Sequence, residues 1–373
     1  MRTPDVVVIG GGIAGASIAY EIAAHRSVVL LEAESALAVH TTARSAATWI
    51  PGHGTAAFRA LTTASGPRFT ALAEELDAPR FLSPRAVLWA AFDDDGEREL
   101  ELMLAERAGE PDVPARLTSA EARRLCPVLR EPRAGALTEN GADIDVMGLH
   151  QAFVRGLRRR GGEIRTGARI AAIERAGQDW RIRTTGGEEV TAPDVVDAAG
   201  AWADVVAGLA GVPPVGLQAY RRTIAIVPVP TPTGPLPMVS DPAERFYFKN
   251  EDPEGTTLLL SPGDETPLAP GDPKPDELDV ALGLERVEEV TGLGLRSVRT
   301  AWAGLRTFAP DRSPVVGPWP EHPGFHFFAG QGGSGVESAP ALAALGAAVV
   351  TGTSVPADIA LGADQVAPVR AQM

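Results

Sequence analysis

The sequence predicts an α/β protein of two domains, one built on a parallel sheet and the other on a second sheet. Residues 5–31 read as strand, glycine-rich turn, helix and second strand, the unit from which helix-covered parallel sheets are assembled. A second strand enters a glycine-rich turn and a helix at residues 325–339. Strand-like segments at 221–228, 246–249 and 257–261 predict a second sheet.

The first glycine-rich turn has the spacing G-x-G-x-x-G between a predicted strand, residues 5–9, and a predicted helix, residues 16–24. Gly10 allows the tight turn, Gly12 lets the backbone approach a pyrophosphate, and Gly15 lets the helix pack closely on the strand. The N-terminus of the helix then presents free N–H groups and a partial positive charge to phosphates.

A second predicted strand, residues 27–31, is closed by Glu32, whose carboxylate would accept hydrogen bonds from ribose hydroxyls. These elements follow one another in the order of a βαβ dinucleotide-binding unit: strand, turn, helix, second strand and acid. This order predicts a Rossmann-like domain that binds a dinucleotide. Besides the glycines and Glu32, we expect Ile13, Ala14 and Ala33 to contact it.

The remaining elements follow from hydrophobic spacing and from capping signals. Thr118 and Glu121 have capping-box spacing, and Pro127 stops the helix that they begin. Asp145 is placed to cap another helix, which ends at residues 161–162. Helices are predicted at residues 55–76, 96–106, 119–125, 146–160, 203–210, 273–289 and 339–350. Further strands are predicted at residues 86–92, 163–166, 170–175, 180–184, 189–191 and 194–197.

The second glycine-rich junction, residues 330–335, bears on which dinucleotide is bound. A nicotinamide enzyme needs only one such junction. A two-domain flavin enzyme uses a second one, which points a helix N-terminus at the pyrimidine ring of the flavin. An ordinary turn in a glycine-rich chain is the alternative. The two junctions together favour FAD over a nicotinamide cofactor.

Composition excludes several classes of protein. The chain has 373 residues, 45% hydrophobic, with a formal net charge of −14 and no basic run, so we expect no nucleic-acid partner. Cys126 is the only cysteine, and the histidines lack metal-ligand spacing, so we expect no metal. No apolar stretch has the length of a membrane span and no signal-peptide pattern precedes the first strand, which predicts a cytoplasmic protein.

Several further segments carry a resemblance to a known family. Arg-Ser-Ala-Ala at 44–47 and Trp-Ala-Gly-Leu-Arg within 300–306 are its most specific motifs. The other segments are residues 8–17, 141–145, 198–202, 208–212, 221–222, 246–247 and 331–333. On these segments the chain resembles, nearly from end to end, the FAD-dependent oxidoreductases related to D-amino-acid oxidase, glycine oxidase and sarcosine oxidase. Its greatest similarity is to bacterial D-arginine dehydrogenases. The resemblance implies a two-domain flavoprotein with a substrate domain on an antiparallel sheet.

The resemblance also implies which residues hold the flavin. The segment 41–47 would wrap it, and the loop after the last strand would lie against its ring system. The implied contacts are Thr42, Arg44, Ser45, Ala46, Ala199, Gly200, Gly332, Gly333, Gly335 and Val336.

For the substrate, the resemblance implies that Arg222 and Arg306 grip a carboxylate, assisted by Tyr247. A planar guanidinium offers a fork of donors to a carboxylate, and two of them fix the orientation of an amino acid. That orientation would place the Cα–H over flavin N5 for hydride transfer. Because Arg221 and Arg222 alternate along a strand, only one faces the pocket, and we expect Arg222.

Departures from the D-arginine dehydrogenases concern the substrate side chain. Val87 stands where those enzymes have a glutamate for the substrate guanidinium, and Thr48 stands where they have a pocket histidine. A cationic side chain left without a partner at Val87 would lose about 3–5 kcal/mol. Together with Trp49 and Ile50, Val87 predicts an apolar or aromatic pocket, in which D-arginine and D-lysine are poor substrates.

Two histidines leave alternatives open. His53 replaces a lid tyrosine of those enzymes, and Glu337 replaces a glutamine. His53 is either a lid or proton-relay residue or a loop histidine that faces water. A covalent flavin link is conceivable at His40, but we expect FAD to bind non-covalently. Cys126 is far in sequence from the final loop, so a cysteinyl link is not expected.

We therefore expect an FAD-binding domain from residues 1–82, 145–214 and 307–373 and a substrate domain from residues 83–144 and 215–306. The predicted reaction is oxidative deamination of an apolar D-amino acid to an imino acid, which hydrolyses to a keto acid and ammonia. Alternatives are oxidation of a cyclic or N-substituted amine acid such as D-proline or sarcosine, a nicotinamide-dependent reductase, and a non-catalytic flavoprotein subunit. The electron acceptor, oxygen or a quinone, stays open.

Overall fold

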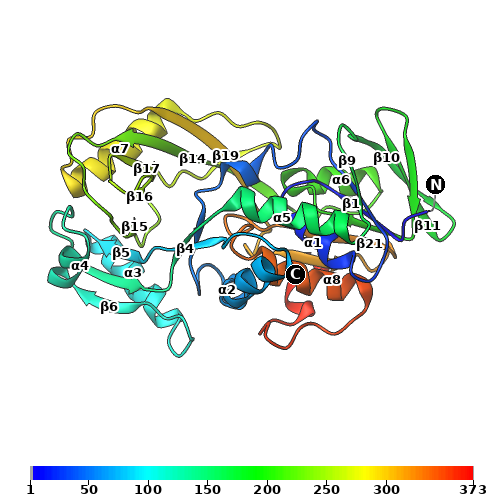
Figure 1. The fold of residues 1–373 in the computed structure, drawn as a ribbon, viewed down its shortest axis with the longest axis horizontal. Coiled ribbons are helices and arrows are strands. Elements are labelled where there is room, and N and C mark those ends of the chain that lie inside the picture. Colours follow the sequence, from blue (N-terminus) through cyan, green and yellow to red (C-terminus); the bar gives the residue numbers. More distant parts are fainter. Residues whose placement is uncertain (1–2, 373) are drawn as a thin grey trace.

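A six-stranded sheet in the order β20-β21-β13-β1-β2-β9 forms one half of the molecule in this computed structural model, which describes residues 3–372 (Figure 1). All neighbouring strands are parallel except β20 and β21. The strands are β1 (Val6–Ile9), β2 (Val28–Leu31), β9 (Glu163–Arg165), β13 (Asp194–Asp197), β20 (Val315–Pro318) and β21 (Phe325–Ala329).

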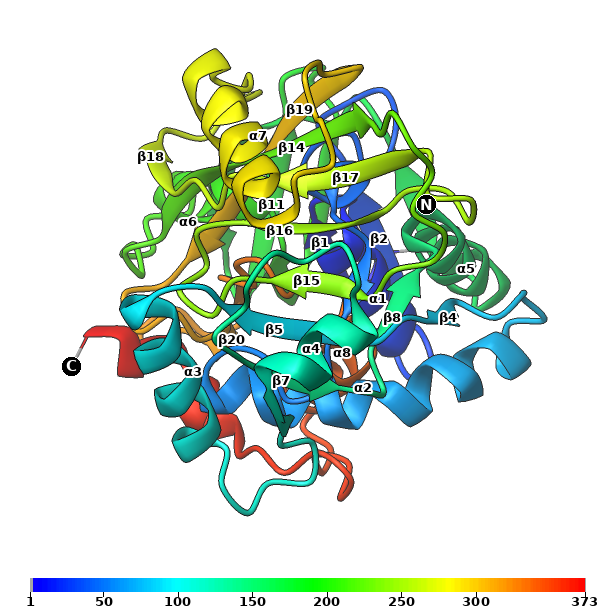
Figure 2. The same ribbon diagram turned by 90° about the vertical axis from the view of Figure 1, so that its left-hand side faces the viewer.

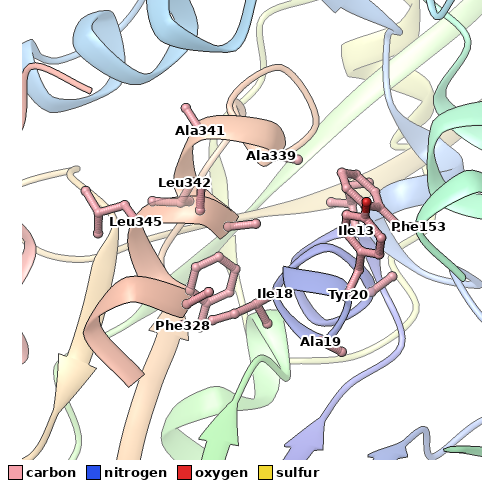
Figure 3. Packing of buried hydrophobic residues seen from close by; sticks show 14 of the residues in the cluster. Ile13, Ile18, Ala19, Tyr20, Phe153, Phe328, Ala339, Ala341, Leu342 and Leu345 are labelled. Atoms are coloured by element: carbon pink, nitrogen blue, oxygen red, sulfur yellow. The ribbon is translucent and has the colours of Figure 1, made fainter. Parts of the chain in front are cut away.

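Both faces of this sheet are covered. Val6 and Val8 of β1 point to one face, into a core that Figure 3 shows around Ile18 and Phe328. The helices on this face are α1 (Ile13–Ile22), α2 (Ala56–Glu75), α5 (Val146–Arg159) and α8 (Ala339–Thr351). Val7 and Ile9 point to the other face because strand side chains alternate. That face is covered by the antiparallel strands β10 (Ile170–Ala176), β11 (Asp179–Thr184) and β12 (Glu189–Ala192) and by α6 (Ala203–Leu209).

The other half is a nine-stranded sheet in the order β18-β14-β17-β16-β15-β5-β7-β6, with β19 also paired to β14 (Figure 2). Only the β5–β15 pair is parallel. Its strands are β5 (Val87–Ala91), β6 (Ala115–Thr118), β7 (Ala134–Thr138), β14 (Gln218–Pro228), β15 (Met238–Ser240), β16 (Tyr247–Asn250), β17 (Thr257–Ser261), β18 (Thr266–Leu268) and β19 (Thr300–Phe308). The core on one face includes residues of α4 (Ser119–Leu125) and α7 (Glu277–Thr291). The other face packs in part on α3 (Asp94–Glu106).

A small third sheet of β3 (Thr48–Trp49), β8 (Ala142–Ile144) and β4 (Leu82–Pro84) adjoins the nine-stranded sheet. Lys249 of β16 is buried, and its Nζ donates to Asp143 Oδ1 at 2.6 Å and to Thr48 Oγ1 at 3.1 Å. Burial lowers the pKa of Lys249, while the Asp143 carboxylate acts in the opposite direction. These two contacts fix the positions of β8 and β3 relative to the nine-stranded sheet.

Most predicted elements form, and their ends differ for local reasons. The helix at 119–125, with its capping box, and the strands at 194–197, 257–261 and 325–329 have the predicted bounds. The helix predicted at 96–106 begins at Asp94, because the Asp93 side chain accepts from Gly96 N. The helix predicted at 273–289 spans Glu277–Thr291, because Asp276 caps it and Gly292 ends it in the left-handed region.

The strands that were not predicted from the sequence are the short strands β3, β4, β6, β7, β8, β15, β18 and β20 and the long strand β19. The short helical turns are η1 (Thr41–Arg44), η2 (Gly200–Trp202), η3 (Ala363–Val366) and η4 (Pro368–Gln372). The two large sheets take their strands from segments close to the predicted domains, although β19 extends beyond residue 306. Of the predicted FAD-binding domain, residues 1, 2 and 373 lie outside the described residues. Within residues 3–372, no helix is both long enough and apolar enough to cross a membrane.

Candidate active site

A single continuous cavity runs from the glycine-rich turn after β1 to the inner face of the nine-stranded sheet. The space not filled by atoms, its open mouth included, is about 2200 Å³. All the predicted site residues line it except Gly15, Trp49 and Val87. The walls come from segments as far apart in the chain as residues 9–14, 38–50, 198–202, 222–247 and 331–337.

The glycine-rich turn forms one end of the cavity. Gly10 has a φ of 110°, and a Cβ there would lie 2.4 Å from the carbonyl oxygen of Ala198. A Cβ at Gly15 would lie 1.8 Å from the carbonyl oxygen of Gly10, so Gly15 serves the close packing of α1 rather than the cavity wall. Gly12 stands directly before α1, and its N–H has no hydrogen-bond partner among residues 3–372. A free N–H at a helix N-terminus is suited to a phosphate oxygen.

The Glu32 carboxylate lies beside this turn on the cavity wall, next to Ala33. Its Oε2 accepts from Gly11 N at 2.6 Å, and its Oε1 accepts from Glu34 N at 2.8 Å. These bonds hold the carboxylate in place, and each oxygen keeps a second acceptor position for a ribose hydroxyl. Turn and acid therefore fit the phosphate and ribose groups of a dinucleotide.

Residues 41–46 follow the cavity wall toward the nine-stranded sheet. Thr42 Oγ1 accepts from Ile13 N at 2.9 Å, which ties this segment to the first turn of α1. The Arg44 guanidinium donates to Ala303 O at 2.9 Å and pairs with Asp272. The charge of Arg44 is therefore already paired within the protein.

The loop between β21 and α8 forms the opposite wall. Gly332 has a φ of 54°, and its N–H donates to Thr307 O at 2.8 Å, which anchors the loop to β19. A Cβ at Gly333 would lie 3.0 Å from Cζ of Arg306, so the missing side chain lets the loop lie against that guanidinium. The wall is completed by Ala199, Gly200, Gly335 and Val336.

Arg222 and Arg306 lie on the neighbouring strands β14 and β19. The register pairs Arg222 with Gly304 and Tyr220 with Arg306, so the two arginines are diagonal neighbours on one face of the sheet. Arg221 points to the other face, where Nη2 donates to Asp279 Oδ2 at 2.6 Å. The register therefore places Arg222, and not Arg221, on the cavity wall.

The two cavity arginines differ in their partners. Arg222 is buried, its Nε donates to Asp264 O at 2.9 Å, and its Nη2 lies 3.1 Å from Glu265 Oε1. Burial lowers the pKa of Arg222, and the nearby Arg306 charge lowers it further. The Arg306 guanidinium has neither a hydrogen bond nor an ion pair within the described part of the chain. An anion between the arginines would relieve their repulsion.

Two further polar groups face this part of the cavity. Tyr247 is buried on β16, and its Oη has no hydrogen-bond partner in the described structure. Glu244, in the loop before β16, also lines the wall. Burial acts to raise the pKa of the Glu244 carboxyl, but His53, Arg306 and Arg222 together lower it.

His53 lies on the cavity wall with its side chain 29% exposed. Its Nδ1 is 3.4 Å from Oε1 of Glu337, a carboxylate whose side chain is only 6% exposed. The His53 ring stacks on Trp89 at 5.9 Å between centroids and 27° between planes. Thr48 lies on the wall as well, while Ile50, Trp89, Ile224 and Met238 form an apolar surface around this end of the cavity.

The structure corrects two predicted pocket residues. Val87 is fully buried and does not line the cavity, because the turn before β8 covers it: a Cβ at Gly141 would lie 3.0 Å from Val87 Cγ2. Trp49 is also outside the cavity, since its Nε1 donates to Thr62 O at 2.9 Å and its ring packs against Phe69. Trp89, which was not predicted from the sequence, lines the cavity instead.

Glu244 is a second cavity residue that was not predicted from the sequence. Alternation along β5 could have suggested Trp89, because it shares a face with Val87. The loop that carries Glu244 has no comparable pattern. Cys126 lies outside the cavity in a hydrophobic core, and burial raises the pKa of its thiol to about 12.

Comparison with known proteins identifies the family. Residues 5–349 match the model of the family described as DAO, FAD dependent oxidoreductase. FAD-dependent oxidoreductase domain-containing protein 1 from Bos taurus is 31% identical over 165 residues, which span 40% of this chain and 33% of that protein.

Solved structures agree with this match. The L-proline dehydrogenase from P. horikoshii superposes with a TM-score of 0.85 at 20% identity. The aligned region covers 100% of this chain and 98% of the dehydrogenase chain. The glycine oxidase from Geobacillus kaustophilus superposes with a TM-score of 0.82 at 23% identity. The aligned region covers 95% of this chain and 96% of the oxidase chain. Because the family model spans most of its length, the chain belongs to the DAO family of FAD-dependent oxidoreductases.

Proposed function

We propose that this FAD-dependent oxidoreductase oxidises the Cα–N bond of an amino acid whose carboxylate is bound by Arg306 together with Arg222 and Tyr247. The observation that carries the proposal is the pair of unpartnered groups in the cavity, the Arg306 guanidinium and the Tyr247 hydroxyl. Both are donors, and a carboxylate accepts from both. The Gly333 backbone lies against Arg306, which supports carboxylate binding next to the flavin-ring loop.

The cofactor site fits FAD along the whole cavity. The phosphates would be held by the Gly12 region, the ribose by Glu32, and the ring system between residues 42–46 and 332–336. Bound FAD supplies the chemistry by accepting the hydride from the substrate. The protein contributes orientation through its arginines.

For the substrate side chain we propose an apolar group. The support is the surface of Ile50, Trp89, Ile224 and Met238, and no longer Val87, which lies outside the cavity. A D configuration and a particular likeness to D-arginine dehydrogenases are proposals from the sequence resemblance. A cyclic or N-substituted amine acid is the second candidate, favoured by the similarity in fold to an L-proline dehydrogenase and a glycine oxidase.

The test is anaerobic bleaching of the visible flavin absorbance by a panel of D- and L-amino acids, glycine, sarcosine and D-proline. We expect rapid bleaching by apolar amino acids and slow bleaching by D-arginine and D-lysine. Faster bleaching by sarcosine or proline would select the second candidate. If no compound bleached the flavin, amino-acid oxidation would be excluded for this panel, in favour of a more specialised amine or a non-catalytic flavoprotein. Admitting air, or adding a quinone, then identifies the electron acceptor.

A further inference from the structure

We propose that His53 accepts the proton that the substrate ammonium group must lose, and that Glu337 is the positioning residue that prepares His53 for this step. The inference rests on the proposed function, because only an amine oxidation requires a neutral nitrogen lone pair before hydride leaves Cα. It also assigns a role to Glu337, whose side chain is not needed to bind either the substrate carboxylate or the flavin.

The position of Glu337 determines which nitrogen of His53 carries hydrogen. Glu337 is buried, and its Oε2 accepts from Ile50 N at 3.0 Å. Its Oε1 lies 3.4 Å from His53 Nδ1. An ionised carboxylate accepts hydrogen bonds but cannot donate them, so Nδ1 of a neutral His53 carries the hydrogen. Nε2 is then the basic nitrogen.

His53 is also held in orientation for this role. Its ring stacks on Trp89. Trp89 is fixed in turn, because its Nε1 donates to Thr138 Oγ1 at 3.1 Å. Nε2 of His53 has no hydrogen-bond partner within the described residues, and the side chain lines the same cavity as Arg306. A cavity histidine whose one nitrogen faces a carboxylate and whose other nitrogen lacks a partner within the described residues has the arrangement of a general base.

Charged groups of both signs lie near His53. Glu337 faces it from the loop before α8, and Glu244 faces it from the loop before β16. The cations on this side are Arg306 and Arg222, which couple to Glu244, and Arg107, which couples to Glu337. Of these charged groups, Glu337 is the one within salt-bridge distance of the imidazole, at 3.4 Å.

The proposed step is a single proton transfer. The N–H bond of the substrate ammonium breaks, the electron pair stays on nitrogen as a lone pair, and the proton bonds to His53 Nε2. Since His53 is partly exposed, it returns the proton to solvent after the reaction. No bond to Glu337 forms or breaks, so its contribution is orientation and charge.

The variant Glu337→Gln tests the role of the carboxylate. A glutamine keeps an oxygen for Ile50 N but presents an NH₂ donor to His53 Nδ1, which forces the tautomer whose Nε2 carries hydrogen and cannot accept a proton. With a substrate that bleaches the wild-type flavin, we expect the rate of anaerobic flavin reduction at neutral pH to fall by about 10²-fold or more in Glu337→Gln and in His53→Gln. Near pH 10, about the pKa of a free amine, solution supplies neutral amine and we expect the loss to shrink to a few-fold.

The control is Glu139→Gln, the same atomic change at an exposed residue outside the cavity. FAD content, and the Kd of a non-reacting carboxylate such as benzoate, should stay unchanged in every variant, because Arg306 is intact. Should Glu337→Gln fail to fold, His53→Gln at its partly exposed position provides the test. Rates equal to wild type across the pH range in His53→Gln would overturn the inference, as would a loss in Glu337→Gln that does not recover at high pH. A wild-type flavin bleached by no amine would instead overturn the proposed function.

Discussion

At the scale of single residues, the cavity is unusual because it contains an arginine side chain without a partner among the described residues. Most arginines of the described chain have carboxylate or carbonyl partners, including Arg44, Arg221 and Arg222. Arg306 has none, although it faces a neighbouring guanidinium. The stability of this arrangement would improve with a bound anion, which is why we place the substrate carboxylate there.

Replacing Arg306 tests this placement. We expect Arg306→Met to weaken binding of a non-reacting carboxylate by roughly 10- to 100-fold, the equivalent of losing one charged hydrogen bond of about 1.5–3 kcal/mol. The measurement is a titration of the flavin absorbance spectrum. Arg123→Met, at an exposed position, is the matched control and should bind as wild type. Equal affinity in Arg306→Met would show that the carboxylate binds elsewhere.

His150 gives a pH dependence to the glycine-rich turn. It is buried, its Nε2 donates to Gly11 O at 2.9 Å, and burial lowers its pKa. Below the unfolded value of about 6.5, the unfolded chain binds a proton that the folded chain does not, so folding stability is lost as pH falls. We expect the drop in Tm between about pH 7 and about pH 5 to be smaller in His150→Gln, which keeps a donor but does not titrate. His25→Gln, at an exposed histidine, should keep the wild-type drop.

At the scale of elements, local patterns predicted the strands and helices that local residues determine. The capped helix at 119–125 and the apolar strand at 325–329 are of this kind. β15 has only three residues, and its pairing with β5 joins segments about 150 residues apart, so no local pattern specifies it. The same dependence on tertiary contacts explains why the predicted pocket position of Val87 was wrong. Alternation gives its face, but the covering turn at Gly141 is a tertiary contact.

Two helical glycines allow the effect of close packing on stability to be distinguished from the effect of helix propensity. Gly15→Ala would place a Cβ 1.8 Å from the Gly10 carbonyl oxygen, whereas nothing lies within 4 Å of a Cβ at Gly208 in α6. We expect Gly15→Ala to reduce both the Tm and the fraction of protein that retains FAD. We expect Gly208→Ala to raise stability by about 0.5–1 kcal/mol. Thermal unfolding and flavin content of the two purified variants check both outcomes, and an unaffected Gly15→Ala would contradict the packing argument.

At the scale of the whole molecule, the cavity is built by both large sheets at once. The six-stranded sheet supplies the glycine-rich turn, and the nine-stranded sheet supplies the arginines and Tyr247. A motif in the sequence marks the first part, because one contiguous segment makes it. The second part needs the register between β14 and β19 and the course of the loop before β16, so only the resemblance anticipated it.

A cofactor that contacts both halves should stabilise the molecule as a unit. We expect FAD at 100 times its Kd to add about 2.7 kcal/mol to the free energy of unfolding of the apoprotein, and the Tm to rise with FAD concentration. Scanning calorimetry with FAD, with NAD as the control dinucleotide, measures this. A Tm that rises with NAD and not with FAD would contradict the assignment of the cavity.

The alternation along β5 sets a rule for redesigning the substrate range. Val87 and Trp89 share a face, yet one is sealed beneath a turn and the other forms cavity wall. Substitutions at position 87 would therefore mostly affect folding, whereas substitutions at position 89 would change the cavity volume that is available to a substrate. Because Trp89 also supports the His53 ring, enlarging the pocket at this position would trade catalytic rate for a broader range of substrates.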